Sequence, residues 1–175
     1  MPMKKIIALI LFVLCFVPVF SQHAGDSIDC SDRIGYSWMK SYGNANAEFV
    51  SDVAVDNAGN IYFAGTFAET LSVDGNTVVS EGNTDFYVAK MSPEGSALWL
   101  KSGGSNAVEQ ANAIAVDADG NVYVSGLSND NTAFDGNRFP SLGSKDGFLL
   151  KLDNDGNMLY VRTLGCINDD NAYDV

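Results

Sequence analysis

Two short acidic turns carry oxygen atoms of the kind that bind calcium. The residues are Asp117, Asp119 and Asn121 in the first turn and Asp153, Asp155 and Asn157 in the second. Calcium takes about six to eight oxygen ligands, and an EF-hand loop supplies them over roughly twelve residues. Both turns are shorter, and the same residue types serve tight turns, where Asp accepts backbone N–H bonds and Gly or Asn adopts positive φ. We interpret them as turn-forming residues, with calcium binding as the weaker alternative.

Charged and aromatic residues recur at fixed positions in two places. Asp85 precedes Lys90 by five residues, as Asp146 precedes Lys151. An odd separation along a strand puts the two side chains on opposite faces, so each is expected to meet partners on neighbouring strands or units. A second recurring position holds the aromatic residues Trp38, Trp99 and Tyr160. Aromatics on an exposed rim can stack on sugars, but at repeated positions burial between units is the favoured interpretation.

No recognisable catalytic set is present in the sequence. It has no serine-nucleophile, zinc-protease or phosphate-loop motif and no Cys/His pair, and its one histidine, His23, abuts the expected signal-peptide cleavage site. The acidic residues that recur lie in turns, so no carboxylate pair is set apart as a glycosidase would need. We therefore expect a non-enzymatic protein without a cofactor.

These residues are positioned by an internal repeat of 61 residues. The stretch Val53–Gly65, VAVDNAGNIYFAG, returns as Ile114–Gly126, IAVDADGNVYVSG. Two further landmarks, at Asp85/Asp146 and at Trp38/Trp99, keep the same offset without insertions. A fixed period of this size is typical of repeat architectures, in which neighbouring units stack. The units run over about 53–113 and 114–174, preceded by the last strand of a unit that begins at Trp38.

Each unit reads as strands separated by turns, without helical periodicity. The first unit predicts strands at 51–56, 61–67, 85–91 and 97–102, with a small hairpin at 71–79 around Asp74-Gly75. The second predicts strands at 122–128, 146–153 and 158–163, with a hairpin at 135–137. The sequence therefore predicts an all-β fold of antiparallel four-stranded meanders.

Four-stranded units that stack radially are the blades of a β-propeller. An open solenoid or a twisted sandwich fits less well, because hairpins within each unit favour a meander. The chain holds about 2.3 units, whereas propellers use roughly four to eight blades. We expect either a piece of a longer protein or several copies in one ring, and an isolated piece is expected to self-associate through exposed edges.

The repeat resembles the SBBP β-propeller repeat from Trp38 onward. The matching residues are Asp56, Gly59, Asn60, Tyr62, Gly65, Gly82, Asp85, Lys90, Gly95, Leu98, Trp99, Lys101 and Gly104, then Asp117, Gly120, Asn121, Tyr123, Gly126, Gly143, Asp146, Lys151, Gly156, Leu159 and Gly165. Tyr160 and Arg162 depart from the tryptophan and lysine of the first copy. The resemblance implies a secreted or surface protein of bacteria.

The N-terminal sequence points to export as well. Residues 1–21 combine Lys4 and Lys5 with an apolar run that ends at Phe20, as in a signal peptide; the alternative, a membrane anchor, needs about twenty apolar residues. Residues 22–35 are expected to be a disordered leader, followed by the repeat region 36–175. Outside the cell, Cys30 and Cys166 could pair.

The net charge of the chain limits the classes of partner that we expect it to bind. Without Lys4 and Lys5 the chain has 8 basic and 22 acidic residues, a net charge of −14. Such a surface repels phosphate backbones, which argues against nucleic acids and anionic membranes. We expect a secreted or cell-surface scaffold that binds a protein or a glycan. The alternatives are a carbohydrate-active enzyme or its accessory module, and a calcium-stabilised adhesin.

Overall fold

The structure of the protein is a computed structural model that describes residues 38–43, 48–129, 131–140 and 143–175. The predicted signal peptide, the leader and Cys30 lie outside these residues, so the structure does not test them. Cys166 is exposed and has no disulfide partner among these residues. The described residues include no helix with the length and apolar character needed to cross a membrane.

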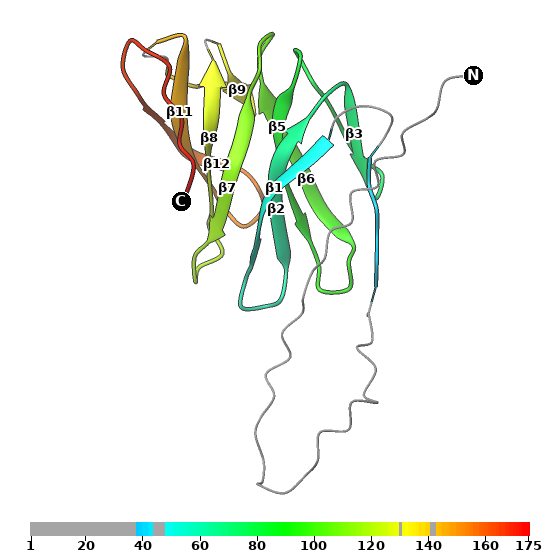
Figure 1. Ribbon diagram of the computed structural model, residues 1–175. Helices are drawn as coiled ribbons and strands as arrows, with labels where there is room; N and C mark the ends of the chain where they lie inside the picture. The colour runs from blue at the N-terminus through cyan, green and yellow to red at the C-terminus, as the bar shows by residue number, and fades with distance from the viewer. Residues whose placement is uncertain (1–37, 44–47, 130, 141–142) are drawn as a thin grey trace, which may run out of the picture.

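Two antiparallel sheets, one from each unit, form the body of the molecule (Figure 1). The first unit contributes β1 (Glu48–Val55), β2 (Ile61–Phe67), β5 (Asp85–Met91) and β6 (Ala97–Gly104), which pair in that order. The second contributes β7 (Gln110–Val116), β8 (Val122–Asn129), β11 (Lys145–Leu152) and β12 (Met158–Leu164), again in chain order. The prediction of an all-β fold of antiparallel four-stranded meanders is confirmed.

A short hairpin interrupts each meander between its second and third main strands. The first hairpin is β3 (Thr70–Val73) with β4 (Asn76–Val79), and the second is β9 (Ala133–Phe134) with β10 (Asn137–Arg138). Asp74 and Gly75 both have positive φ, 47° and 86°, as a two-residue turn between twisted strands requires. Asp135 and Gly136 repeat this geometry.

The second hairpin joins the sheet of the first unit. β9 pairs with β6, with Gly103 opposite Phe134 and Gly104 opposite Ala133, so that the first sheet has the order β1-β2-β5-β6-β9-β10. Strand β6 accordingly runs to Gly104, two residues beyond the predicted end. The second unit therefore passes its hairpin to the first, which fixes these two units side by side, whereas β3 and β4 form a two-stranded sheet of their own.

A bulge in the innermost strand of each unit explains one recurring glycine. The register shifts between Val50 and Asp52 in β1, and between Ala111 and Ala113 in β7. A Cβ at Gly65 would lie 1.8 Å from the Phe49 carbonyl oxygen, and one at Gly126 would lie 1.9 Å from that of Gln110. Only glycine allows the backbones to approach this closely.

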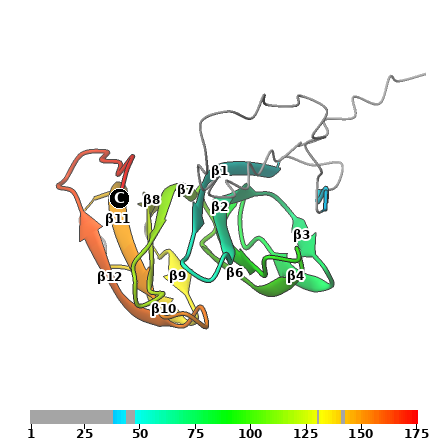
Figure 2. The ribbon, with the colours of Figure 1, turned by 90° about the horizontal axis from the view of Figure 1, so that it is seen from below.

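The main core lies between the two sheets. Side chains of β2 and β5 pack there against those of β7, β8 and β11; the largest include Tyr62, Phe86, Phe134, Phe139, Phe148, Leu150 and Leu152. A second cluster covers the opposite face of the first sheet and includes Phe63, Phe67, Tyr87 and Met91. Strands β2 and β5 are therefore buried along their whole length. Figure 2 shows the sheets side by side, with β1 and β7 adjacent.

One predicted element is different in the structure. Residues 38–43, expected to form the last strand of a preceding unit, are not part of a strand. A last strand pairs with the third strand of its own unit, as β6 pairs with β5, and the described residues supply no such partner to 38–43. The segment nevertheless packs on the second cluster through Trp38 and Tyr42.

Candidate functional site

The acidic turns use their carboxylates to hold the turn itself. Asp117 Oδ1 accepts the backbone N–H groups of Asp119 at 3.0 Å and Asn121 at 2.8 Å. Its Oδ2 accepts the Asn121 side-chain amide at 2.8 Å and the Tyr123 hydroxyl at 3.1 Å. Asp56 makes the same four bonds with Ala58, Asn60 and Tyr62. The recurring Asp, Asn and Tyr therefore form one hydrogen-bonded unit on the turns at Asp56 and Asp117.

These bonds keep the carboxylates charged. The side-chain amide of Asn121, with its backbone N–H, holds the pKa of the Asp117 carboxyl below its usual range, and Asn157 does the same for the pKa of Asp153. Asp155 and Asn157 contribute backbone N–H groups to Asp153 at 2.9 and 2.8 Å. Among the residues that the structure describes, no three His, Cys, Asp or Glu side chains are grouped as a metal site would require.

The recurring aromatic residue joins each unit to the next. Trp38 donates its indole N–H to the carbonyl of Pro93 at 2.8 Å, and Trp99 donates to the carbonyl of Asn154 at 3.1 Å. Each ring lies against the glycine of the same turn, Gly95 or Gly156. Both tryptophans are half-buried and pack on the hydrophobic clusters. Tyr160, at the same repeat position, instead lies beside the Arg162 guanidinium at 5.2 Å.

An ion pair between strand and hairpin recurs with the same offset. Lys40 contacts Asp74 at 2.6 Å and Lys101 contacts Asp135 at 3.4 Å. Asp74 also accepts the Tyr42 hydroxyl at 2.9 Å and the Ala97 backbone N–H at 3.0 Å. Both aspartates sit at the first turn position of their hairpin, so the ion pair ties that hairpin to the last strand or segment of the preceding unit.

The side chain of Asn154 connects the second unit to the first, a contact that was not predicted from the sequence. It accepts a hydrogen bond from the ammonium of Lys90, a residue that is only 6% exposed, and another from the Tyr62 hydroxyl at 3.0 Å. The counterpart of Asn154 in the first unit is Pro93, which has no polar side chain. Lys151, the counterpart of Lys90, approaches Asp117 at 4.0 Å within its own unit. The departure from the repeat was the only sequence signal for this contact.

The recurring aspartate at the start of the third main strand is buried. Asp85 is 2% exposed and accepts the Glu81 backbone N–H at 2.9 Å. Burial, together with the carboxylates of Glu109 and Glu81, raises the pKa of Asp85 to about 6. Glu109 is fully buried and is bonded to Ser105 and Thr132. Both carboxylates are therefore shielded from any large substrate.

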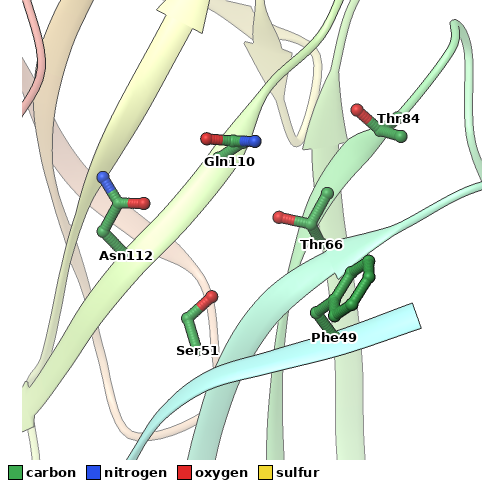
Figure 3. Close-up of a pocket in the computed structure, with 6 residues that line it drawn as sticks. All are labelled: Phe49, Ser51, Thr66, Thr84, Gln110 and Asn112. Atoms are coloured by element: carbon green, nitrogen blue, oxygen red, sulfur yellow. The ribbon is translucent and has the colours of Figure 1, made fainter. Parts of the chain in front are cut away.

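A groove with varied side-chain chemistry lies between the innermost strands of the two units (Figure 3). It has a volume of about 280 Å³ and is lined by Phe49, Ser51, Thr66, Thr84, Gln110 and Asn112. Figure 3 shows the polar ends of Ser51, Thr66 and Asn112 directed toward one space, with Gln110 and Phe49 at its two ends. We call this site the inner groove. All its side chains are uncharged, and the Phe49 ring is 60% exposed.

The inner groove lies where the two units differ. Phe49 and Ser51 have Gln110 and Asn112 as their counterparts, and Thr66 and Thr84 correspond to Leu127 and Lys145. Sequence reasoning passed over these positions because it followed the residues that recur. A comparison of inward-facing positions at which the copies disagree would have indicated them.

The comparison with protein families agrees with the fold. Residues 103–131 match the family model for the SBBP beta-propeller repeat, a stretch that includes β7 and β8. The predicted resemblance is thereby confirmed over these residues. None of the curated proteins matches the chain.

Proposed function

We propose that this chain is an exported, non-enzymatic scaffold that holds a protein or glycan ligand on the inner face of its propeller blades. The observation that carries this proposal is that the residues that recur in both units and the residues that differ between them lie in different places and make different contacts. Recurring residues such as Asp117 and Trp99 hold turns and neighbouring units together, whereas every residue that lines the inner groove differs from its counterpart in the other unit. A concave site with several convergent polar groups is the usual form of a ligand site.

A binding role fits the groove better than catalysis. No carboxylate, histidine, cysteine or lysine lines the inner groove, so it offers no general acid, base or strong nucleophile. The buried carboxylates of Asp85 and Glu109 are bonded to neighbouring backbone and hydroxyl groups. The alternative, a carbohydrate-active enzyme, would need chemistry from residues beyond this groove.

Export is supported by residues 1–21 and by the acidic charge of the remainder. Production of the full chain in a bacterial host, followed by mass spectrometry of the N-terminus, tests this part. We expect the chain outside the cytoplasm, shortened by cleavage after about residue 21. A chain that stays in the cytoplasm with residues 1–21 intact would contradict export.

Site-directed photocrosslinking tests the binding role without assuming the class of ligand. The exposed Phe49 is replaced by p-benzoylphenylalanine, and the full chain is irradiated with the extracellular medium and surface extract of the source cells. Leu98, which is 50% exposed on β6, provides the control position. We expect crosslinks specific to position 49. Equal labelling from both positions would overturn the assignment of the inner face, and release of new reducing ends from added polysaccharides would favour the enzyme.

A further inference from the structure

We infer that the inner groove binds a neutral saccharide. This inference rests on the proposed scaffold function and gives it a ligand class. The lining side chains are three hydroxyls, two amides and one exposed phenyl ring. Hydroxyls and amides both donate and accept hydrogen bonds, as the hydroxyls of a sugar do.

Neighbouring residues fix the direction in which one of these groups points. The Asn112 amide nitrogen donates to Asn171 Oδ1 at 2.7 Å and to the carbonyl of Ala172 at 2.8 Å. Both of its N–H groups are thereby used, and Figure 3 shows its oxygen turned into the inner groove. Asn112 therefore presents a fixed acceptor for a ligand hydroxyl.

The Thr84 hydroxyl lacks a partner. Its oxygen is buried and makes no hydrogen bond with any other residue that the structure describes. A buried polar group without a partner carries a desolvation cost. Because this oxygen is itself buried, a ligand hydroxyl relieves that cost only if the Thr84 side chain rotates toward the inner groove. Thr66, only 8% exposed, presents a second hydroxyl nearby.

Phe49 supplies the apolar part of the site. Its ring is 60% exposed at one end of the inner groove (Figure 3). A flat aromatic face beside convergent hydrogen-bonding groups suits a pyranose, which has an apolar C–H face and a rim of hydroxyls. A volume of about 280 Å³ lies at the small end of ligand sites, so one or two sugar units would occupy it.

Charge selects against anionic ligands. No charged side chain lines the inner groove, and the whole chain has a net charge of −12. A uronic acid or sulfated sugar would be repelled by the acidic surface without a cationic residue to hold it. The ligand is therefore expected to be uncharged.

An extended peptide fits less well. Peptides that add to a sheet edge use its free backbone N–H and C=O groups. On β7, the Ile114 N–H is already bonded to Asp52 at 2.9 Å, and both β1 and β7 carry bulges that interrupt regular pairing. Side-chain recognition of a saccharide avoids this obstacle.

The test is an NMR-monitored titration of the full chain with cellohexaose, laminarihexaose and mannohexaose, with oligoalginate as the anionic comparison. We expect at least one neutral hexaose to bind and oligoalginate to fail. Phe49→Ala and Gln110→Ala should each weaken binding by about tenfold, the effect of losing one good contact. Thr66→Val removes a hydroxyl at nearly constant volume and should act in the same direction.

Leu98→Ala is the matched control, since it truncates an exposed apolar residue on β6. It should leave the affinity unchanged, and the melting temperature of each variant verifies its fold. Failure of all the neutral hexaoses, or binding that the groove variants leave intact, would overturn the saccharide assignment. A peptide or protein crosslinked at position 49 would overturn it too, while the scaffold proposal would stand.

Discussion

The indole of Trp99 lies so close to Gly156 of the following turn that a Cβ on Gly156 would be 3.1 Å from Cδ2 of the ring. Trp38 and Gly95 repeat the relationship, with the corresponding distance 2.6 Å. Both glycines also have a φ of 82°, a region that disfavours other residues. The recurring Trp and Gly thus form one contact between units.

Gly156→Ala should therefore destabilise the protein for two reasons. Positive φ costs alanine about 1–2 kcal/mol, and the clash with Trp99 adds about 1 kcal/mol or more. Urea unfolding measures the sum. Gly136→Ala is the control, because φ there is 75° but no atom lies within 4 Å of the added methyl. A Gly156→Ala loss no larger than that of Gly136→Ala would contradict the contact.

Asn154→Ala should lower the free energy of unfolding, because Lys90 depends on the neighbouring unit for its hydrogen-bond partners. Lys90 is 6% exposed, and its ammonium bonds to the carbonyl of Asn154 at 3.3 Å as well as to the side chain. Removal of the amide leaves a buried charge with fewer partners, which costs about 1.5–3 kcal/mol.

A double-mutant cycle with Lys90→Met isolates this interaction. In the Lys90→Met background, Asn154→Ala should cost less than about 1 kcal/mol, since the buried charge is gone. If Asn154→Ala lowered the free energy of unfolding equally with Lys90 and with Lys90→Met, Asn154 would be acting through its own turn instead. Asp155→Ala, on the exposed neighbouring position, controls for the turn.

The sequence was sufficient to predict the turns and hairpins that recur in each unit. Turns such as Asp117–Asn121 and the hairpin at Asp74-Gly75 form through neighbours close in sequence, so local residue types determine them. The four-stranded meander followed from those turns. Because the chain contains two copies of the repeat, comparing them also distinguished the positions that recur from those that differ.

Contacts between units were harder to predict. The pairing of β9 with β6 joins residues about 30 positions apart, and nothing in the type of Ala133 or Gly104 specifies that partner. Residues 38–43 contain the same Trp and Lys as β6, but the part of the chain that the structure describes offers them no strand to pair with. Likewise, Phe49 and Gln110 occupy the same repeat position but differ in residue type, so neither belongs to the recurring pattern. The inner groove therefore became apparent only once the units were placed together.

Asp85 should make stability fall as pH rises from about 4 to 6. Burial first, and then the nearby carboxylates, raise its pKa to about 6 in the folded state, while the unfolded value is near 3.8. Between these values the folded state holds a proton that the unfolded chain has released, so stability is fully present below the lower value and is lost through the upper one. At 1.36 kcal/mol per pKa unit, the loss is about 3 kcal/mol.

Asp85→Asn should remove this slope, measured as the free energy of unfolding in urea at intervals from pH 4 to 7. Asp119→Asn removes one acidic group from an exposed position and serves as the control for net charge. Its pH profile should parallel that of the unmodified chain. If Asp85→Asn also keeps the slope, the titration belongs to another group.

Calcium should leave the melting temperature unchanged. A ligand that binds only the folded state stabilises it in proportion to the logarithm of its concentration over Kd, so a site saturated at millimolar calcium would shift the transition. The Asp117 oxygens already accept four bonds from the turn, and those of Asp153 accept three. A calcium ion would have to displace those donors. Differential scanning calorimetry in calcium chloride and in EDTA should give transitions within about 1 °C. If calcium raised the melting temperature by more than this, and the increase disappeared in Asp119→Asn or Asp155→Asn, these turns would instead be established as calcium sites.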